Sequence, residues 1–111
     1  MKLESKFWIE KNGEKVFGEG PCLLLEEVNK SGSLNKAAIK LNMSYSKAWT
    51  IINRAENILG YPLLERRIGG VDGGGSYLTS NGRILVENYQ NFCQEADKAL
   101  EELYKKYLKD I

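Results

Sequence analysis

The chain has 111 residues, of which 42% are hydrophobic and 28% are charged, and its formal net charge at pH 7 is +1. These values are typical of one soluble globular domain with a modest core. The longest aliphatic run, Leu23-Leu24-Leu25, is too short to span a bilayer, and the N-terminus lacks the apolar stretch of a signal peptide, so we expect a cytoplasmic protein without membrane contact. The absence of histidine and the isolation of Cys22 and Cys93 argue against a metal site, a cofactor and an enzyme.

Positive charge is concentrated in the middle of the chain. Residues 33–54 carry no acidic side chain, whereas acidic residues outnumber basic ones at both ends. The four charged residues of this segment are all basic: Lys36, Lys40, Lys47 and Arg54. Separate lysines often form only a solvated face, but a local patch without acids favours the phosphate backbone of a nucleic acid.

Residues 7–18 are predicted to form a β-hairpin. Asn12-Gly13 is the pair that a type I′ turn prefers, because both central positions need a positive φ. Four apolar residues would form one face, with Trp8 on the other: Phe7, Ile9, Val16 and Phe17. This hairpin would occupy an N-terminal part of the domain, residues 1–20.

Three helices are predicted to follow. The first runs from about residue 21 to 30 and presents Leu24, Leu25 and Val28 on one face. The second and third begin at the N-cap residues Ser33 and Ser44, are joined by a tight turn at residues 42–43, and the third ends near residue 59. A stripe at helical spacing on the third helix is expected to be buried: Ala48, Ile52, Ala55 and Leu59. The opposite face is polar.

A second hairpin and a long helix complete the domain. Residues 62–68 and 77–79 are predicted strands around a loop with five glycines, and a helix is expected from Thr79 or Ser80 to the end. Its apolar stripe can pack within the chain or across a dimer; we favour a dimer, because a helix that projects beyond its core usually needs a partner. The predicted dimer residues are Leu85, Tyr89, Phe92, Ala96, Leu100, Leu103 and Tyr107.

Three helices followed by a hairpin are the parts of a winged helix. We therefore predict one mainly α domain with a small β component, residues 1–111: a winged helix-turn-helix at 21–79 and a long C-terminal dimerisation helix at 80–111. The third helix is slim near its start and can approach the floor of a major groove. The predicted DNA-binding residues are Ser33, Lys36, Ser44, Tyr45, Ser46, Lys47, Trp49, Thr50, Asn53, Arg54, Arg66 and Arg67.

Three of these residues have alternative roles. Trp49 can pack against the wing or the first helix, or face the groove. Tyr45 has the same two alternatives, packing within the fold or facing DNA, and we favour a contact with phosphate. Asn53 can bind adenine or a phosphate, or form a bridge within the fold. The sequence alone leaves these alternatives open.

Residues 32–67 resemble the DNA-binding domain of LysR-type regulators without gaps. The shared hallmarks are Gly32-Ser33, Ala37-Ala38, Leu41, Ser44, Glu56, Leu59-Gly60, Pro62-Leu63 and Glu65-Arg66, continued by Leu78-Thr79 and Gly82. Ser44-Tyr45, Ala48-Trp49, Asn53 and the glycine-rich wing are more similar to the N-terminal domain of ModE, the molybdate-dependent regulator. The resemblance implies a winged helix that dimerises through a long helix at 80–108 and binds specific DNA sequences as a transcription factor.

Two departures from that family refine the expectation. Full-length ModE proteins continue into molybdate-binding domains, whereas this chain ends at Ile111, so molybdate binding is not expected. The family commonly has a lysine in the wing, and this chain has Asp72, which phosphate would repel. Wing contacts are therefore predicted at Arg66 and Arg67, and the sequence leaves open whether the tip contacts DNA.

The leading hypothesis is a homodimeric regulator that binds double-stranded DNA at an inverted repeat, with half-site centres about 34 Å apart or a multiple of that. The alternative is a dimeric winged-helix interaction module that works with a separate sensor subunit and binds DNA weakly or not at all. An enzyme has little support, because no nucleophile lies beside a base in the sequence.

Overall fold

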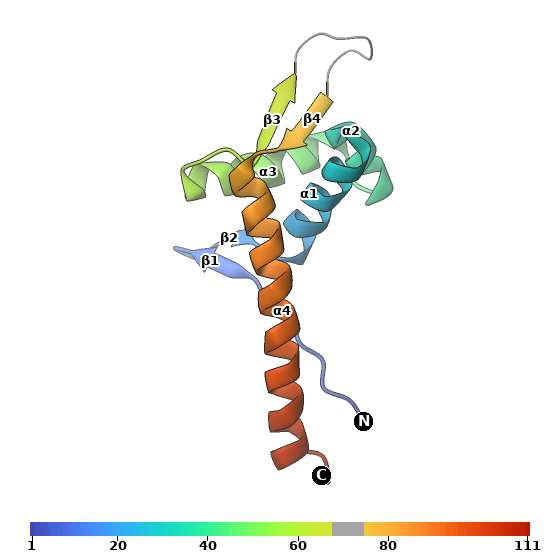
Figure 1. Cartoon of the computed structure of the whole chain (residues 1–111), viewed down its shortest axis with the longest axis vertical. Coiled ribbons are helices and arrows are strands. Elements are labelled where there is room, and N and C mark those ends of the chain that lie inside the picture. Colours follow the sequence, from blue (N-terminus) through green and yellow to red (C-terminus); the bar gives the residue numbers. More distant parts are fainter. Residues whose placement is uncertain (68–74) are drawn as a thin grey trace.

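The computed structural model describes residues 1–67 and 75–111, so the prediction about Asp72 lies outside the described residues. The elements follow one another as two hairpins and four helices, which matches the predicted mainly α winged helix-turn-helix (Figure 1). In chain order they are β1 (Ile9–Lys11), β2 (Glu14–Phe17), α1 (Glu19–Ser31), α2 (Leu34–Lys40), α3 (Tyr45–Leu59), β3 (Leu64–Arg67), β4 (Gly75–Leu78) and α4 (Ser80–Tyr107). Among the described residues, no helix is long and apolar enough to cross a membrane.

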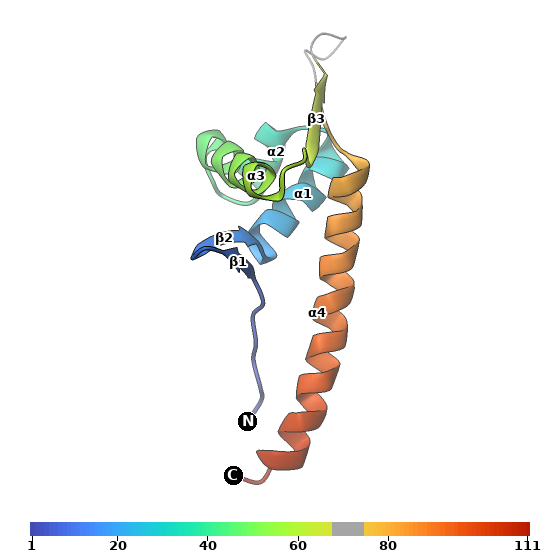
Figure 2. The same cartoon turned by 90° about the vertical axis from the view of Figure 1, so that its left-hand side faces the viewer.

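Helix α1 forms the centre of the core and lies between α3 and α4 (Figure 2). Leu24, Leu25 and Val28 have no exposed surface, which confirms the face predicted from their spacing. The predicted stripe of α3 is also confirmed, with three residues buried and Leu59 partly buried against the core. The buried α3 residues are Ala48, Ile52 and Ala55.

The helix ends follow from their capping residues. Ser33 Oγ accepts a hydrogen bond from the Lys36 N–H at 3.1 Å, and Ser44 Oγ accepts one from the Lys47 N–H at 3.1 Å. Both are the predicted N-caps. Helix α1 begins at Glu19, two residues earlier than predicted, because the first turn of a helix tolerates the missing N–H of a proline such as Pro21.

The N-terminal hairpin has the predicted turn but not the predicted faces. Asn12 and Gly13 have φ values of 52° and 81°, as the type I′ turn requires. Val16 and Phe17 are both buried although they are neighbours, whereas Ile9 is 54% exposed. The pairing register shifts at Ile9, so strict alternation of faces does not hold along this short strand. The assignment of Ile9 to the apolar face was therefore wrong.

The N-terminal segment, residues 1–8, runs antiparallel along α4 (Figures 1 and 2). Its backbone accepts hydrogen bonds at both ends, from Tyr89 Oη to the Phe7 carbonyl at 2.7 Å and from Tyr104 Oη to the Met1 carbonyl at 3.3 Å. Between them, Ser5 Oγ donates to Asp97 Oδ1 at 3.0 Å. Part of the α4 stripe therefore has a partner within its own chain.

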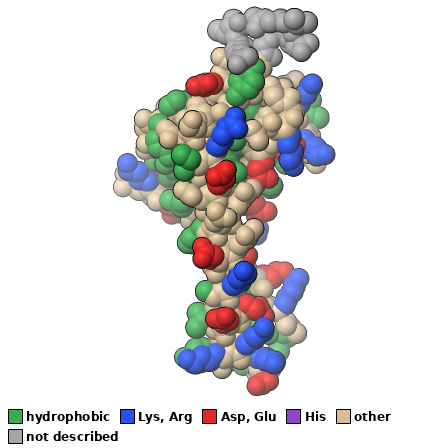
Figure 3. Space-filling view, viewed as in Figure 1, with side chains coloured by type: hydrophobic (Ala, Val, Ile, Leu, Met, Phe, Trp, Pro, Cys, Tyr) green, Lys and Arg blue, Asp and Glu red, His purple; other side chains and the backbone are tan. Residues whose placement is uncertain are grey.

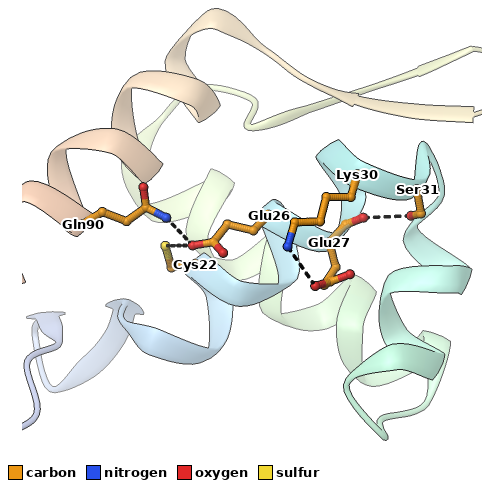
Figure 4. A network of polar contacts seen from close by, with 6 residues as sticks. All are labelled: Cys22, Glu26, Glu27, Lys30, Ser31 and Gln90. Carbon is orange, nitrogen blue, oxygen red and sulfur yellow. Dashed lines mark hydrogen bonds and ion pairs between the residues drawn. The ribbon is translucent and has the colours of Figure 1, made fainter.

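A polar network joins α1 to α4 (Figure 4). The Glu26 carboxylate accepts hydrogen bonds from Cys22 Sγ at 3.5 Å and from the Gln90 side-chain amide. Burial, and then the nearby Glu26 carboxylate, raises the pKa of the Cys22 thiol from 9.0 to about 12. Cys22 is thus a buried, protonated thiol that fills a small space in the core.

Candidate nucleic-acid interface

The predicted DNA-binding residues gather on α2, α3 and the base of the wing. Most of their side chains are exposed, and Ser33 and Asn53 are half-buried. The side chain of Arg67 lies outside the described part of the chain. The exposed members are Lys36, Ser44, Tyr45, Ser46, Lys47, Trp49, Thr50, Arg54 and Arg66.

The exposed face of α2 and α3 is basic. Within the described residues, the ion pairs join Lys2 to Glu4 and Lys30 to Glu27, so no basic residue of α2 or α3 is neutralised by a salt bridge. In the space-filling view, blue side chains gather at the edge of the α2–α3 region, while blue and red side chains mix along the far part of α4 (Figure 3). An uncompensated basic face of this kind attracts phosphate.

Two aromatic residues lie on this face one helical turn apart. Tyr45 is 46% exposed and Trp49 is 41% exposed. Trp49 also lines a recess of about 240 Å³ between α3 and β3, together with Asn53 and Arg66. Trp49 therefore borders the wing and keeps an exposed edge, which is compatible with both of its predicted roles.

The hydroxyl group of Thr50 is partly occupied. Thr50 Oγ1 donates to the Ser46 carbonyl oxygen at 2.9 Å, which leaves its lone pairs available as acceptors. In this arrangement Thr50 cannot donate to a base edge until that hydrogen bond is exchanged. Lys47 and Arg54 have no such constraint among the described contacts, so they are the freer donors on α3.

Glu56 has a structural role beside this face, and sequence analysis named it only as a hallmark. It is the one acidic residue of α3, and its Oε2 atom accepts hydrogen bonds from the Leu63 N–H at 2.7 Å and the Leu64 N–H at 3.2 Å. The carboxylate is thereby turned toward the start of β3. A lone acid on an otherwise basic helix, just before the capping Gly60, was the available signal.

The predicted dimer residues divide into two groups along α4. Leu85 and Tyr89 pack against the core of their own chain, where the Tyr89 ring meets Phe17 edge-on at 5.4 Å. Phe92 is 57% exposed even though its ring meets Phe7 at 5.5 Å. The others lie farther along α4, with Ala96 and Leu100 half-buried and Leu103 and Tyr107 exposed.

No group of three or more His, Cys, Asp or Glu side chains that could hold a metal ion occurs among residues 1–67 and 75–111. The capped helix pair, the basic face of α3 and the paired strands of the wing define the chain as a winged helix-turn-helix domain.

Comparison with known proteins identifies the family. The model of the family described as "Bacterial regulatory helix-turn-helix protein, lysR family" matches residues 23–83, and the chain belongs to this family. The resemblance inferred from the sequence is therefore confirmed.

Relatives named ModE are similar to this chain. The molybdenum transport protein ModE of Azotobacter vinelandii is 40% identical over 80 residues, which cover 72% of this chain and 30% of that protein. The DNA-binding transcriptional dual regulator ModE of Escherichia coli (strain K12) is 36% identical over 91 residues, which cover 81% of this chain and 35% of that protein. The chain thus spans about a third of the length of the curated relatives it matches.

A solved structure supports the fold. The crystal structure of a complex between the CbnR DNA-binding domain and DNA superimposes with a TM-score of 0.60 at 22% identity, and the match covers 78% of this chain and 94% of that one. At this identity the likeness concerns the fold, and it confirms the winged helix-turn-helix architecture.

Proposed function

We propose that the chain is a sequence-specific DNA-binding transcription regulator that acts as a homodimer on an inverted repeat. The observation that carries the proposal is the exposed basic surface of residues 33–54 beside the wing, a segment without an acidic side chain. The name of the Escherichia coli relative, a DNA-binding transcriptional dual regulator, supports it.

Helix α3 is the proposed recognition helix. Lys47 and Arg54 are seven residues apart, so they lie on one line of the helix about 10 Å apart along its axis. That separation spans about three base-pair steps, which lets both residues reach one strand at the edge of a major groove. The small exposed residues near the start of α3, Ser44 and Ser46, allow close approach to the bases.

The flanking elements would fix the position of α3 in the groove. Lys36 on α2 and Arg66 on β3 lie on either side of the recognition helix in the chain, and both are exposed. Guanidinium and ammonium groups at such positions bind phosphates and set the register of the helix without reading sequence. Arg67 is proposed to act with Arg66.

Helix α4 is the proposed dimerisation element. Its 28 residues span about 42 Å, and its buried residues are Gly82 and Val86, both near its start. The farther apolar residues Leu103 and Tyr107 are 50% and 67% exposed. A second copy related by a two-fold axis would cover them and would present two recognition helices to half-sites about 34 Å apart.

The first experiment is selection from a random duplex pool at physiological salt, followed by sequencing. Enrichment of an inverted repeat would support the dimeric regulator. Salt-sensitive retention without an enriched motif would replace it with a nonspecific binder. No retention would favour the alternative, a protein-interaction module. Two further expectations stay predictions: the chain does not bind molybdate, and it acts in the cytoplasm.

Substitution of the proposed base-contacting residues tests the mode of binding. Arg54→Ala and Lys47→Ala are each expected to weaken binding to the selected site by about 1–3 kcal/mol if the contact is bidentate to a base. A loss that is equal on all sequences would instead indicate a phosphate contact. Fluorescence anisotropy with selected and scrambled duplexes separates these results.

A matched control is Lys109→Ala, which removes a lysine beyond the end of α4, far from the wing (Figure 1). It is expected to leave the affinity unchanged. If neither Arg54→Ala nor Lys47→Ala weakens binding more than this control, α3 is not the recognition helix.

A further inference from the structure

The short segment Pro62–Leu64 connects the recognition helix to the long helix through its backbone. It follows α3, leads into β3 and lies against the start of α4. From the α3 side, Glu56 Oε2 accepts hydrogen bonds from the Leu63 N–H at 2.7 Å and the Leu64 N–H at 3.2 Å. Two consecutive backbone donors are thus bound by one side chain of α3.

The α4 side binds the carbonyl groups of the same segment. Thr79 Oγ1 donates to the Pro62 carbonyl at 2.8 Å, and the Thr79 N–H donates to the Leu63 carbonyl at 2.9 Å. Thr79 is the N-cap of α4, because its Oγ1 also accepts a hydrogen bond from the Gly82 N–H at 2.9 Å. Four backbone groups in a row are therefore held between one residue of α3 and one of α4.

This connection is also closely packed. Leu63 is fully buried, and Gly82 lies so close to the Leu63 carbonyl that a Cβ atom at residue 82 would overlap it. We call the set Glu56, Pro62–Leu64, Thr79 and Gly82 the α3–α4 bridge. Helix α1 lies between the bodies of α3 and α4, and the bridge joins the two helices through residues 62–64 (Figure 2).

We propose that Glu56 and Thr79 are positioning residues that fix the angle between α3 and α4, and thereby set the half-site spacing that the dimer accepts. The inference rests on the proposed function, in which α3 reads DNA and α4 pairs two copies. Glu56 and Thr79 would therefore affect which operators are bound without touching DNA themselves.

A small change in the angle at the bridge produces a measurable displacement of α3. Tyr45, at the start of α3, lies 11 residues before Glu56, which is about 17 Å along the helix axis. A rotation of about 10° at the bridge then moves the helix by about 3 Å, close to one base-pair step of about 3.4 Å. Loosening the bridge therefore reduces the preference of the dimer for one half-site spacing, whereas loss of a DNA contact weakens binding at every spacing.

The test uses the full chain and the inverted repeat found by selection, in a series of duplexes whose spacer is lengthened or shortened one base pair at a time. The measured quantity is the ratio between the Kd at the neighbouring spacings and the Kd at the best spacing. Glu56→Ala and Thr79→Val are expected to lower this ratio severalfold or to shift the best spacing. Affinity for an isolated half-site is expected to stay unchanged.

Conservative and matched variants complete the design. Glu56→Gln keeps an oxygen acceptor and Thr79→Ser keeps the hydroxyl group, so both are expected to retain the wild-type spacing profile. Glu65→Ala removes an exposed carboxylate from the wing, and it controls for the charge lost in Glu56→Ala. If Glu56→Ala does not fold, Thr79→Val tests the bridge from the α4 side, since it removes one hydroxyl group at similar volume.

The outcomes are distinguishable. A flattened or shifted spacing profile in the folded variants, with retention in the conservative ones, supports the inference. An unchanged profile, with or without equal weakening at every spacing, overturns the inference and leaves the proposed function intact. A wild-type chain that selects no inverted repeat overturns both.

Discussion

The head of the molecule and the outer part of α4 are stabilised in different ways. The head comprises residues 9–67 and 75–86, and it contains all the buried apolar residues of the described chain, from Val16 to Val86. The outer part of α4, residues 92–107, contains none. One region has its own core, while the other is a helix with a half-covered apolar stripe.

This difference has a thermodynamic consequence. Burial of the head residues occurs within one chain, so it contributes to stability at any protein concentration. If the outer stripe is buried by a second copy, its contribution rises with protein concentration, because association is linked to folding by mass action. The N-terminal segment covers only part of the stripe, through Phe7 and Ser5. Substitutions in the head should therefore change stability equally at all protein concentrations, whereas the effect of substitutions in the outer part of α4 should depend on concentration.

The largest effect is expected from a charge placed in the outer part of α4. Leu103→Asp would bury a carboxylate in the proposed dimer interface, which is strongly unfavourable. We expect a monomer, and a loss of about 100-fold or more in affinity for the inverted repeat, because two linked half-sites bind far more tightly than one. Light scattering and anisotropy measure the two quantities.

The control for this variant is Lys98→Ala, an exposed polar position on the same helix. It should remain dimeric with unchanged affinity. A Leu103→Asp chain that stays dimeric would mean that the outer stripe is not the interface between copies.

The next effect is expected from a cavity in the head. Leu25 is fully buried in α1, and Leu25→Ala should lower the free energy of unfolding by about 3 kcal/mol through lost burial and the cavity left behind. Urea titration at two protein concentrations measures it, and the loss should be the same at both. Leu23→Ala, a 39% exposed neighbour on α1, should cost less than about 1 kcal/mol. Equal losses for the two variants would contradict the assignment of the core.

Local signals predicted most of the head. Ser33 and Ser44 are N-caps because a short hydroxyl side chain satisfies a free N–H group of the first turn, and this depends on few neighbouring residues. The buried stripe of α3 follows from helical periodicity in the same way. The side chains available to DNA on the opposite face could therefore be predicted, and the structure finds them exposed or half-buried wherever they are described.

Contacts between distant segments could not be predicted. The hydrogen bond from Ser5 to Asp97 joins residues 92 apart, and neither residue carries a local sign of the other. The carboxylate of Glu56 likewise meets Leu63 and Leu64 only because the chain reverses at Gly60. Ile9 is exposed beside a register shift in the β1–β2 pairing, which periodicity alone does not reveal.

The two cysteines report on the two regions separately, because one lies in the head and the other in the outer part of α4. Cys22 is buried in the head, and Cys93 is half-buried where the outer part of α4 begins. Burial and the Glu26 carboxylate raise the pKa of Cys22 to about 12, so its reactive thiolate is about 1,000-fold scarcer than at the ordinary value of 9.0. Alkylation at pH 8, followed by mass spectrometry, should therefore modify Cys93 first and Cys22 only after unfolding.

The same pKa shift predicts how stability depends on alkaline pH. Below pH 9, Cys22 is protonated in both the folded and the unfolded chain, and its contribution is complete. Between pH 9 and pH 12 the unfolded chain ionises and the folded chain does not, so the free energy of unfolding falls by up to about 1.4 kcal/mol per pH unit. The Cys22→Ala variant lacks this slope. Tyr89, whose pKa is also raised to about 12, is present in the wild type and in the variant, so its contribution is common to both proteins. Parallel pH profiles for the two proteins would mean that Cys22 is accessible to water, and that the head does not close over the start of α1.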